Sequence, residues 1–286
     1  MPRLSAIYDW VQQNQKLKVN KIPFSEINTI ISGITGIPKQ VLLVHSDIRV
    51  SSSELKKIQK AITKRIDHYP LQYILGFVEF MGIRFFINEG VLIPRPETEL
   101  LVETALKYID ELQYETILDL CCGSGVVGLS IAYLNKQTHV SLCDNSSKAI
   151  NLTRKNSQLL GLNHRCTLFK SDLFSGIPVS SKFDLIVSNP PYVPEERLSS
   201  LPKEINYEPV EAINGGEKGM ELISRIIQQA GSYLNKSGML IIEHDDTQKR
   251  YLERIGIVDT GSTLKYVKTI NDLSGLPRVS VFVSSS

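Results

Sequence analysis

The spacing of apolar residues changes along the chain and divides it into two regions. Up to about residue 70, apolar residues recur at intervals of three and four, which predicts short amphipathic helices. In the first of these, Leu4, Ile7 and Val11 fall on one face. The pattern therefore predicts a small helical bundle at the N-terminus.

Two later segments of this region carry helix start signals. One helix is expected to begin after Pro23, with Ser25 as its cap. A longer one, within residues 51–68, opens with a serine cap and has Glu54 nearby.

Strand signals take over from about residue 77. Residues 77–90 hold two apolar runs around Met81-Gly82, the pattern of a β-hairpin, and residues 94–112 predict a helix with proline in its first turn. Apolar runs then alternate with amphipathic segments, which indicates βαβ units and a parallel sheet. The expected strands are 116–120, 139–144, 166–172, 183–189 and 238–244, and the expected helices between them are 126–136, 146–161 and 219–234.

The end of the chain, residues 262–283, has two strand-like runs with no room for a helix between them. These strands should pair antiparallel at the far end of the sheet. The whole pattern predicts an α/β protein with a helical bundle over residues 1–75, a hairpin linker over 76–92 and a mostly parallel sheet domain over 93–286.

Composition limits the classes of protein that fit this pattern. The 286 residues are 42% apolar and 22% charged, as in an ordinary globular protein with a large core. A net charge of +2 gives no bulk electrostatic argument for a nucleic-acid partner. No window reaches the roughly 18 apolar residues of a membrane span, and the N-terminus lacks the apolar core of a signal peptide. We therefore expect a soluble, cytoplasmic protein without a membrane partner.

The four cysteines, Cys121, Cys122, Cys143 and Cys166, fall in or near predicted strands. None has the CxxC spacing of a zinc site, and adjacent cysteines are poorly placed to bridge each other. They are interpreted as reduced core thiols, and no metal is expected.

A glycine-rich loop after residues 116–120 carries the first chemical signal. Gly123, Gly125 and Gly128 form a G-x-G-x-x-G pattern, which lets the backbone turn sharply and approach a ligand. Asp144 ends the next strand, where a carboxylate can accept hydrogen bonds from both ribose hydroxyls. The loop predicts a nucleoside-containing cofactor, either a dinucleotide or S-adenosylmethionine. A tight turn without a ligand is the alternative.

Three further residues favour S-adenosylmethionine. Asp119 lies two residues ahead of Cys121, where a carboxylate could order the loop or favour a cationic amino group. A dinucleotide would instead place its pyrophosphate at the helix start. Asp172 could accept a hydrogen bond from an adenine amino group, or cap a turn, and Leu173 could cover the adenine face.

The segment Asn189-Pro190-Pro191-Tyr192 follows the fourth strand of the alternating series. Ligands of doubly wound sheets bind beyond the carboxyl ends of the strands, so Asn189 is expected near the glycine loop. The prolines fix φ and lack N–H groups, so they hold the Asn189 side-chain oxygen and the Pro190 backbone oxygen as rigid acceptors. Two such acceptors suit a planar NH₂ group, because binding both N–H bonds orients the nitrogen and opposes delocalisation of its lone pair. Tyr192 offers an aromatic face; a plain strand terminator is the alternative.

Together these segments resemble the HemK-type protein-(glutamine-N5) methyltransferases, which modify peptide chain release factors. The resemblance covers nearly the whole chain. NPPY is shared with methyltransferases that act on amino groups of nucleic acids, whereas PRPETE is more specific. The matching segments, in the family's order, are PLQYILGFVEFMG, VLIPRPETELLVE, LDLCCGSG, SNPPY, YEPVEAINGGEKGMELI and DLSGLPRV.

The resemblance implies a seven-stranded class I (Rossmann-like) methyltransferase domain, S-adenosyl-L-methionine as cofactor, and the glutamine of the release factor's Gly-Gly-Gln loop as substrate. It also implies that the N-terminal bundle helps to grip the release factor. Asn189, Pro190 and Tyr192 would be catalytic. The glutamine would be held by Asn189, Pro190, Pro191 and Tyr192, with Arg95 and Glu97 near the mouth of the site. The cofactor site would be lined by Cys121, Cys122, Gly123, Ser124, Gly125, Asp144, Asp172, Leu173 and Asn189.

Three residues depart from the family pattern. Cys121 stands where the family often has glycine, which would tighten the loop, and Leu173 replaces a residue that is often aromatic. His244 follows its strand where the family usually has E-I-G, and is interpreted as a local surface change rather than a catalytic group. None of the three touches NPPY, so the predicted activity stands.

Other functions stay open at this point. An N6-adenine or N4-cytosine methyltransferase of nucleic acid would share NPPY, but the small net charge and the lack of a large target-recognition insertion count against it. A glutamine methyltransferase of a ribosomal protein would usually differ in PRPETE. In an NAD-binding or non-catalytic protein, NPPY would have no role. We expect a monomer that contacts release factors and no nucleic acid.

Overall fold

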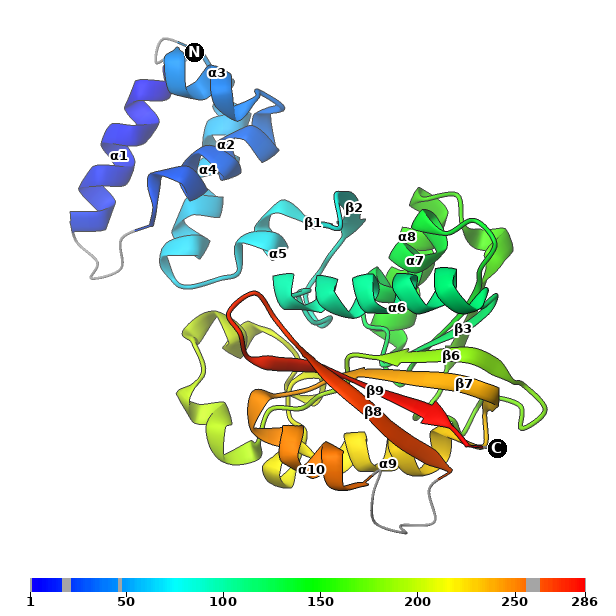
Figure 1. The fold of residues 1–286 in the computed structure, drawn as a ribbon. Helices are drawn as coiled ribbons and strands as arrows, with labels where there is room; N and C mark the ends of the chain where they lie inside the picture. Colours follow the sequence, from blue (N-terminus) through cyan, green and yellow to red (C-terminus); the bar gives the residue numbers. More distant parts are fainter. Residues whose placement is uncertain (1, 17–21, 46–47, 256–262, 286) are drawn as a thin grey trace. The chain divides into compact units, whose positions relative to one another are not determined.

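The computed structural model describes residues 2–16, 22–45, 48–255 and 263–285. The chain divides into two compact units (Figure 1). The first comprises Met1–Phe77 with Pro202–Tyr207, and the second Val78–Leu201 with Glu208–Ser286. The predicted hairpin thus belongs to the second unit, together with the sheet.

The first unit is helical, as the apolar spacing predicts. Its core is formed by isoleucine, leucine and valine side chains, among them the fully buried Leu4, Ile7, Ile30, Ile58 and Ile62. Its helices are α1 (Leu4–Lys16), α2 (Phe24–Thr35), α3 (Lys39–Val44), α4 (Ser52–Ile66), α5 (Leu71–Leu75) and the short 3₁₀ segment η4 (Lys203–Tyr207).

Helix starts in this unit confirm one expected cap and correct another. At the start of α4, the Glu54 amide donates to Ser51 Oγ over 3.1 Å and the Ser51 amide donates to Glu54 Oε2 over 2.7 Å, which completes a capping box. The prediction of Ser25 as a cap is wrong. Pro23 occupies the N-cap of α2, and Ser25 already lies inside the first turn, too late to reach the free amides.

The second unit is built on a seven-stranded sheet. Its strand order is β5-β4-β3-β6-β7-β9-β8, parallel from β5 to β7 and antiparallel at the last two pairings. This confirms the α/β prediction and the antiparallel final pair. The strands are β3 (Thr116–Leu120), β4 (His139–Asp144), β5 (Cys166–Lys170), β6 (Phe183–Ser188), β7 (Leu234–Glu243), β8 (Leu264–Asn271) and β9 (Pro277–Ser284).

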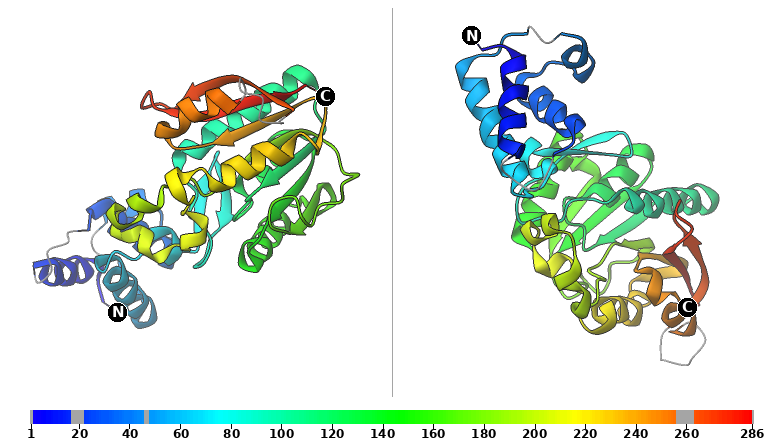
Figure 2. Two further views of the ribbon diagram at one scale, coloured as in Figure 1. Left: turned by 90° about the horizontal axis from the view of Figure 1, so that it is seen from below. Right: turned by 90° about the vertical axis from the view of Figure 1, so that its left-hand side faces the viewer.

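Helices cover both faces of this sheet, so successive residues of the central strands enter different cores (Figures 1 and 2). On β3, Ile117 packs in the cluster with α6, α7 and α8, whereas Leu118 and Leu120 pack in the cluster with α9 and α10. The helices are α6 (Glu99–Leu112), preceded by the 3₁₀ turn η1 (Pro96–Thr98), α7 (Val126–Leu134), α8 (Ser147–Leu159), α9 (Glu221–Ala230) and α10 (Lys249–Ile255).

The predicted hairpin forms from β1 (Phe77–Phe80) and β2 (Ile83–Phe86). Its turn residues Met81 and Gly82 both have positive φ, at 52° and 70°, as a tight two-residue turn requires. Phe80 and Phe85 are buried in the first of the two cores of the second unit, so the hairpin is part of that unit's packing.

One helix prediction extends too far. The apolar pattern of residues 219–234 continues to Leu234, but α9 ends at Ala230 and Leu234 begins β7. Leu234 pairs with Phe183 of β6, and a register shift follows before the regular pairing resumes. A single apolar residue fits both the helical spacing and the strand alternation. Its pairing with a strand that is distant in sequence decides between helix and strand.

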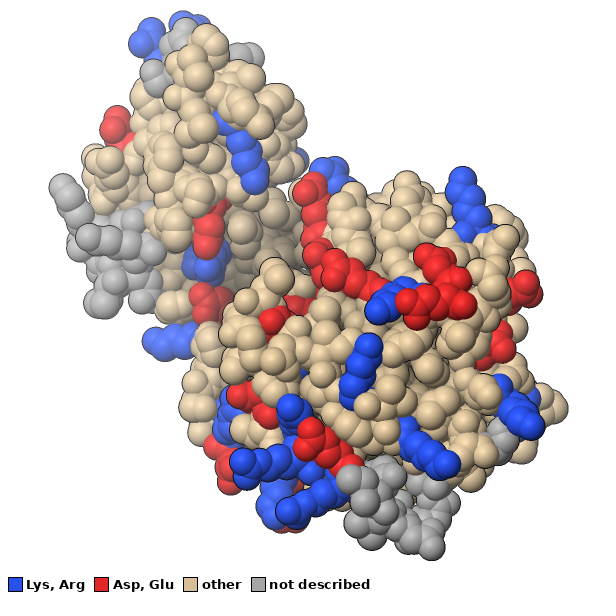
Figure 3. All heavy atoms as spheres, viewed as in Figure 1, with Lys and Arg blue, Asp and Glu red and all other residues tan. Residues whose placement is uncertain are grey.

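The stretch between β6 and α9 consists of short 3₁₀ turns rather than regular elements. In the second unit these are η3 (Glu195–Ser200), η5 (Val210–Ala212) and η6 (Glu217–Gly219); η2 (Asn163–Arg165) and η7 (Asp246–Gln248) lie elsewhere in it. Basic and acidic side chains lie intermixed on the face shown in Figure 3. Among the described residues, no helix is long and apolar enough to cross a membrane.

Replacing Ser51 with Ala should lower the free energy of unfolding of the first unit by about 1 kcal/mol, because the Glu54 amide loses its acceptor. Trp10, the single tryptophan of the chain, packs against the core of this unit, so its fluorescence during urea unfolding reports on that unit. Ser53→Ala is the matched control, since Ser53 is exposed within α4. Equal losses in the two variants would contradict the capping argument.

Candidate active site

The glycine loop and the Asn-Pro-Pro-Tyr segment meet because their strands are neighbours. Leu120 of β3 pairs with Ser188 of β6 in parallel register, and the Ser188 hydroxyl donates to the Leu120 carbonyl over 2.9 Å. Cys121 and Asn189, each one residue further on, therefore emerge side by side. This is the point where the strand order changes direction, the usual ligand site of such sheets.

A cavity of about 500 Å³ opens at this point. It brings together most of the predicted residues, and it is also lined by Thr98 and Asp119. Gly125, Pro190, Tyr192, Arg95 and Glu97 are not among its lining residues. The predicted residues that do line it are Cys121, Cys122, Gly123, Ser124, Asp144, Asp172, Leu173, Asn189 and Pro191.

Asp144 shapes the glycine loop. Its Oδ2 accepts from the Gly123 amide over 2.9 Å and its Oδ1 from the Ser146 amide over 2.8 Å. Burial raises the pKa of Asp144, and these two amide hydrogen bonds oppose the rise. Each oxygen retains a further lone pair on the cavity side, so the predicted role toward ribose hydroxyls fits, and it stays a prediction.

Two side chains of helix α8 hold the glycine loop through hydrogen bonds to its backbone carbonyls. The Thr153 hydroxyl donates to the Gly123 carbonyl over 2.9 Å, and Asn156 Nδ2 donates to the Ser124 carbonyl over 2.8 Å. Gly125 has a φ of 83°, and a Cβ there would lie 2.8 Å from the Thr153 side chain. Cys121 adopts a φ of 58°, in the left-handed region where glycine is favoured, so a cysteine at this position carries backbone strain.

Asp119 is a buried carboxylate at the cavity with only one of its oxygens hydrogen-bonded to a described residue. Its Oδ2 accepts from the Gly128 amide over 2.8 Å, whereas the buried Oδ1 has no hydrogen bond within the described part of the chain. Burial, the largest effect, raises the pKa of Asp119 to about 8. A buried carboxylate facing a cavity with a free oxygen fits a cationic amino group, such as that of S-adenosylmethionine.

The expected adenine end is formed by Asp172 and Leu173. Asp172 Oδ2 forms an ion pair of 2.8 Å with Arg225, while Leu173 is buried with a φ of 48°. Both line the cavity, and Asp172 keeps its second oxygen for a ligand. Hydrogen bonding to adenine stays a prediction.

Asn189 is anchored to a buried hydroxyl by its amide nitrogen. Nδ2 donates to Thr98 Oγ1 over 3.1 Å, and Oδ1 makes no hydrogen bond to any described residue. The side-chain oxygen is thus available at the cavity, as the two-acceptor hypothesis requires. Pro191 lines the cavity beside it, and Pro190 is buried.

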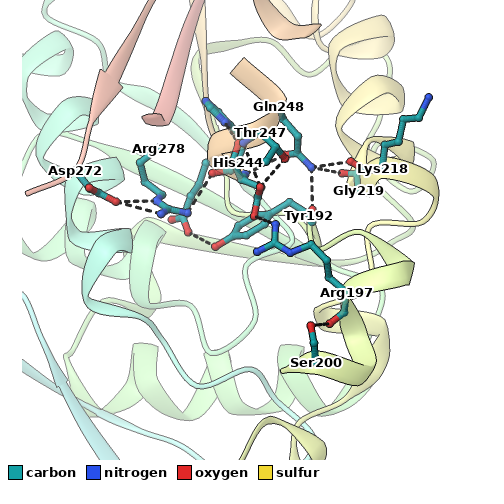
Figure 4. A network of polar contacts seen from close by, with 12 residues as sticks. Tyr192, Arg197, Ser200, Lys218, Gly219, His244, Thr247, Gln248, Asp272 and Arg278 are labelled. Atoms are coloured by element: carbon teal, nitrogen blue, oxygen red, sulfur yellow. Dashed lines mark hydrogen bonds and ion pairs between the residues drawn. The ribbon is translucent and has the colours of Figure 1, made fainter. Parts of the chain in front are cut away.

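Tyr192 is fixed within the wall rather than in the lining of the cavity. Its hydroxyl donates to Glu243 Oε1 over 3.0 Å, and its carbonyl accepts from Gln248 Nε2 over 2.8 Å (Figure 4). The backbone of Gly219 lies so close that a Cβ there would overlap the Tyr192 carbonyl oxygen. These contacts immobilise the end of the NPPY segment, and stacking of the ring on a substrate stays a prediction.

Arg95 forms an ion pair with a buried acid, Glu208. Arg95 donates to Glu208 Oε1 over 2.7 Å, and the Ile93 amide donates to Glu208 Oε2 over 2.9 Å. The Glu208 side chain is 2% exposed, so this pair joins the chain before α6 to the segment after η4. Glu97 is exposed. The predicted role of Arg95 and Glu97 near the mouth of the active site stays a prediction.

The interpretation of His244 as a surface change is wrong. His244 is fully buried, with Nε2 2.8 Å from Ser280 Oγ and Nδ1 2.8 Å from the Asp245 carbonyl. It follows β7, which lies between β6 and β9, so the neighbouring strands cover it. Burial lowers its pKa to about 4, and it is not among the residues that line the cavity.

The cysteines are free thiols, as predicted. Burial raises the pKa of all four, that of Cys143 to about 12, so they stay protonated at neutral pH. Within the described ranges, no group of three or more His, Cys, Asp and Glu residues could hold a metal ion.

Sequence reasoning assigned no role to Thr98, Glu208 or Glu243. Thr98 and Glu208 lie inside the matched segments PRPETE and YEPVEA, but nothing in those segments says which side chain is buried. Glu243 carried a usable signal, since a carboxylate at the carboxyl end of a buried parallel strand lies at the ligand edge of the sheet.

Comparison with known proteins relates most of the chain to one family. The family model "PrmC N-terminal domain" matches residues 11–76, and "Methyltransferase small domain" matches residues 96–203. A release factor glutamine methyltransferase of Clostridium botulinum is 39% identical over 240 residues, 83% of this chain and 84% of that protein. One of Thermodesulfovibrio yellowstonii is 35% identical over 93% of this chain and 95% of that protein.

Solved structures confirm the fold class. A methyltransferase from Pyrococcus furiosus superposes with a TM-score of 0.52 at 17% identity, covering 82% of this chain and all of that one. At this identity the likeness concerns the fold alone.

The affinity for S-adenosylmethionine should rise as the pH is raised from about 6 to 7.5. This range lies below the pKa typical of an α-amino group, so the amino group of the ligand stays positively charged throughout. Asp119, with a pKa of about 8, is largely protonated in the free protein, and a cationic ligand must displace that proton. The rise should be several-fold and can be measured by titration calorimetry at fixed ionic strength. Asp119→Asn should bind more weakly and show no rise; a wild-type affinity independent of pH would contradict this assignment.

Proposed function

Because the chain belongs to the family of release factor glutamine methyltransferases, we propose that it methylates the N5 amide nitrogen of the glutamine in the Gly-Gly-Gln motif of peptide chain release factors. S-adenosyl-L-methionine is the methyl donor. The observation that carries the assignment to an amide is Asn189, whose nitrogen is engaged by Thr98 and whose oxygen is left free at the cavity.

The donor supplies an electrophilic methyl group on a sulfonium, so the protein need only bind and orient it. The turn from Cys121 to Ser124 forms one wall for it, fixed by Asp144. The free Oδ1 of Asp119 suits its amino group. A donor held by this wall would lie next to Asn189, because the strands that carry the wall and Asn189 are paired.

The glutamine amide is a weak nucleophile, since its nitrogen lone pair is delocalised into the carbonyl group. Two oxygens, Asn189 Oδ1 and the Pro190 carbonyl, would accept its two N–H bonds and hold the nitrogen facing the methyl group. These bonds strengthen as the nitrogen becomes positive, so they favour the transition state over the ground state. The N–C bond would form as the S–C bond of the donor breaks, which leaves the donor as a neutral thioether. The positively charged nitrogen would then lose one proton to solvent, so no base is needed before attack.

The first unit would help to grip the release factor. The match of residues 11–76 to the N-terminal domain of the same family supports this assignment. The small net charge, together with the mixed basic and acidic side chains on the face shown in Figure 3, favours a protein partner over nucleic acid. We further propose that the protein acts as a monomer.

The substrate can be tested with labelled S-adenosylmethionine offered with a release factor, its Gln→Ala variant in the Gly-Gly-Gln motif, ribosomal protein and DNA. Label should appear in the intact release factor alone. Label in DNA, in ribosomal protein, or equally in both release factors would overturn the proposal and favour one of the alternative acceptors.

Asn189→Ala should lower kcat by about 10²- to 10³-fold, the usual effect of removing one preorganised polar group from a transition state. Its affinity for S-adenosylmethionine and its melting temperature should change little, because Asn189 is a small part of the cavity wall. Asn145→Ala, at another asparagine of the cavity, is the control and should keep a far higher kcat. Near-normal turnover of Asn189→Ala would refute the two-acceptor mechanism.

A further inference from the structure

The two-acceptor geometry requires a particular orientation of the Asn189 amide. The oxygen and the NH₂ group of an asparagine have nearly the same shape, and a 180° rotation exchanges them. In the rotated form Asn189 would present N–H groups to the substrate N–H groups, and binding would fail. Something in the protein must therefore exclude that form.

Thr98 alone cannot exclude it. Its hydroxyl accepts from Asn189 Nδ2 over 3.1 Å, but a hydroxyl can equally donate its hydrogen to an amide oxygen. Thr98 is 1% exposed, so water offers no alternative partner. The direction of this hydrogen bond depends on where the hydroxyl hydrogen of Thr98 points.

Glu243 is the buried acid that could accept the hydrogen of that hydroxyl. It is fully buried at the end of β7. Burial raises its pKa, and hydrogen bonding from the hydroxyls of Thr98 and Tyr192 opposes the rise. Tyr192 donates to Oε1 over 3.0 Å, whereas the buried Oε2 makes no hydrogen bond of ordinary geometry to a described residue. An ionised carboxylate can only accept, so it can hold hydroxyl hydrogens but cannot supply one.

We propose that Glu243 is a positioning residue that fixes the orientation of the Asn189 amide through Thr98. The carboxylate takes the hydrogen of the Thr98 hydroxyl, which leaves the Thr98 oxygen as an acceptor toward Asn189. Asn189 must then turn its NH₂ group to Thr98 and its oxygen to the cavity. The inference deepens the proposed function and rests on it.

In this arrangement the same carboxylate would hold both ends of the NPPY segment. Tyr192 donates to it directly, and Asn189, which donates to Thr98, would be linked to it through the Thr98 hydroxyl. One buried group would then set the position of the tyrosine and the direction of the asparagine. Thr98 comes from η1, within the PRPETE segment. That segment therefore reaches the reacting atoms through a hydrogen bond rather than through contact with substrate.

Glu243→Gln tests the direction of the hydrogen bonds while keeping the shape. The Gln oxygen can still accept from Tyr192, but its NH₂ group would then donate to Thr98, and the Thr98 hydrogen would turn to Asn189. We expect kcat to fall at least tenfold, with the affinity for S-adenosylmethionine and the melting temperature close to the wild-type values. A folded Glu243→Gln protein with kcat within twofold of wild type would overturn the proposal.

Thr98 variants give a second, independent measurement. Thr98→Val removes the hydroxyl at nearly constant shape and should lower kcat as Glu243→Gln does. Thr98→Ser restores the hydroxyl and should recover most of the activity. The double variant Glu243→Gln with Thr98→Val should be little worse than either single one, because both break the same chain of hydrogen bonds. Additive losses would mean that the two residues act separately, against the proposal.

The pH profile separates this role from a merely structural one. Burial raises the pKa of Glu243 to about 7, while Thr98, Tyr192 and Arg278 oppose the rise and Glu97 adds to it. The wild-type kcat should fall below this pH as the carboxylate protonates. Glu243→Gln should lack that acid limb, and its persistence would contradict the proposal. If wild-type protein does not label the release factor at all, the proposed function fails instead, so the two failures are distinguishable.

Discussion

The parallel pairing of β3 with β6 is the constraint on which the candidate site depends. The register of Leu120 with Ser188 ends both strands at the same level, so the glycine loop and the NPPY segment leave the sheet as neighbours. A slip of one residue would turn every side chain of β6 to the opposite face. Because β3 and β6 are buried on both faces, in two separate cores, such a slip would exchange the side chains packed in each core.

Buried carboxylates then complete the site. Burying an ionised acid is unfavourable unless hydrogen bonds or charges compensate, and each acid here is compensated differently. Asp144 accepts hydrogen bonds from two backbone amides, and Glu208 accepts from Arg95 and from one amide. These two acids therefore fix the loops around the site. Asp119 and Glu243 each keep one oxygen unpartnered among the described residues, and both have a raised pKa. The unpaired oxygen of Asp119 suits the amino group of the cofactor, and that of Glu243 suits the hydroxyl hydrogen of Thr98.

Local patterns predicted most of the fold, because helix and strand periods depend on neighbours in sequence. The capping box at Ser51 and the hairpin turn at Met81 formed as expected. One error was local, and two arose where distant segments intervene. Ser25 lost the cap to Pro23 by local geometry, whereas Leu234 was drawn into β7 by its pairing with β6, and His244 was buried by a strand that follows it in sequence.

The sequence by itself determined the chemistry: a glycine loop that can approach a nucleoside, and two prolines that hold rigid acceptors after a core strand. These properties follow from backbone freedom and are written in consecutive residues. Only the tertiary structure decided which way the acceptors face. The Asn189 amide is hydrogen-bonded to Thr98, 91 residues earlier, and Tyr192 to Glu243, 51 residues later. Such contacts depend on strand register and burial, which no stretch of neighbouring residues specifies.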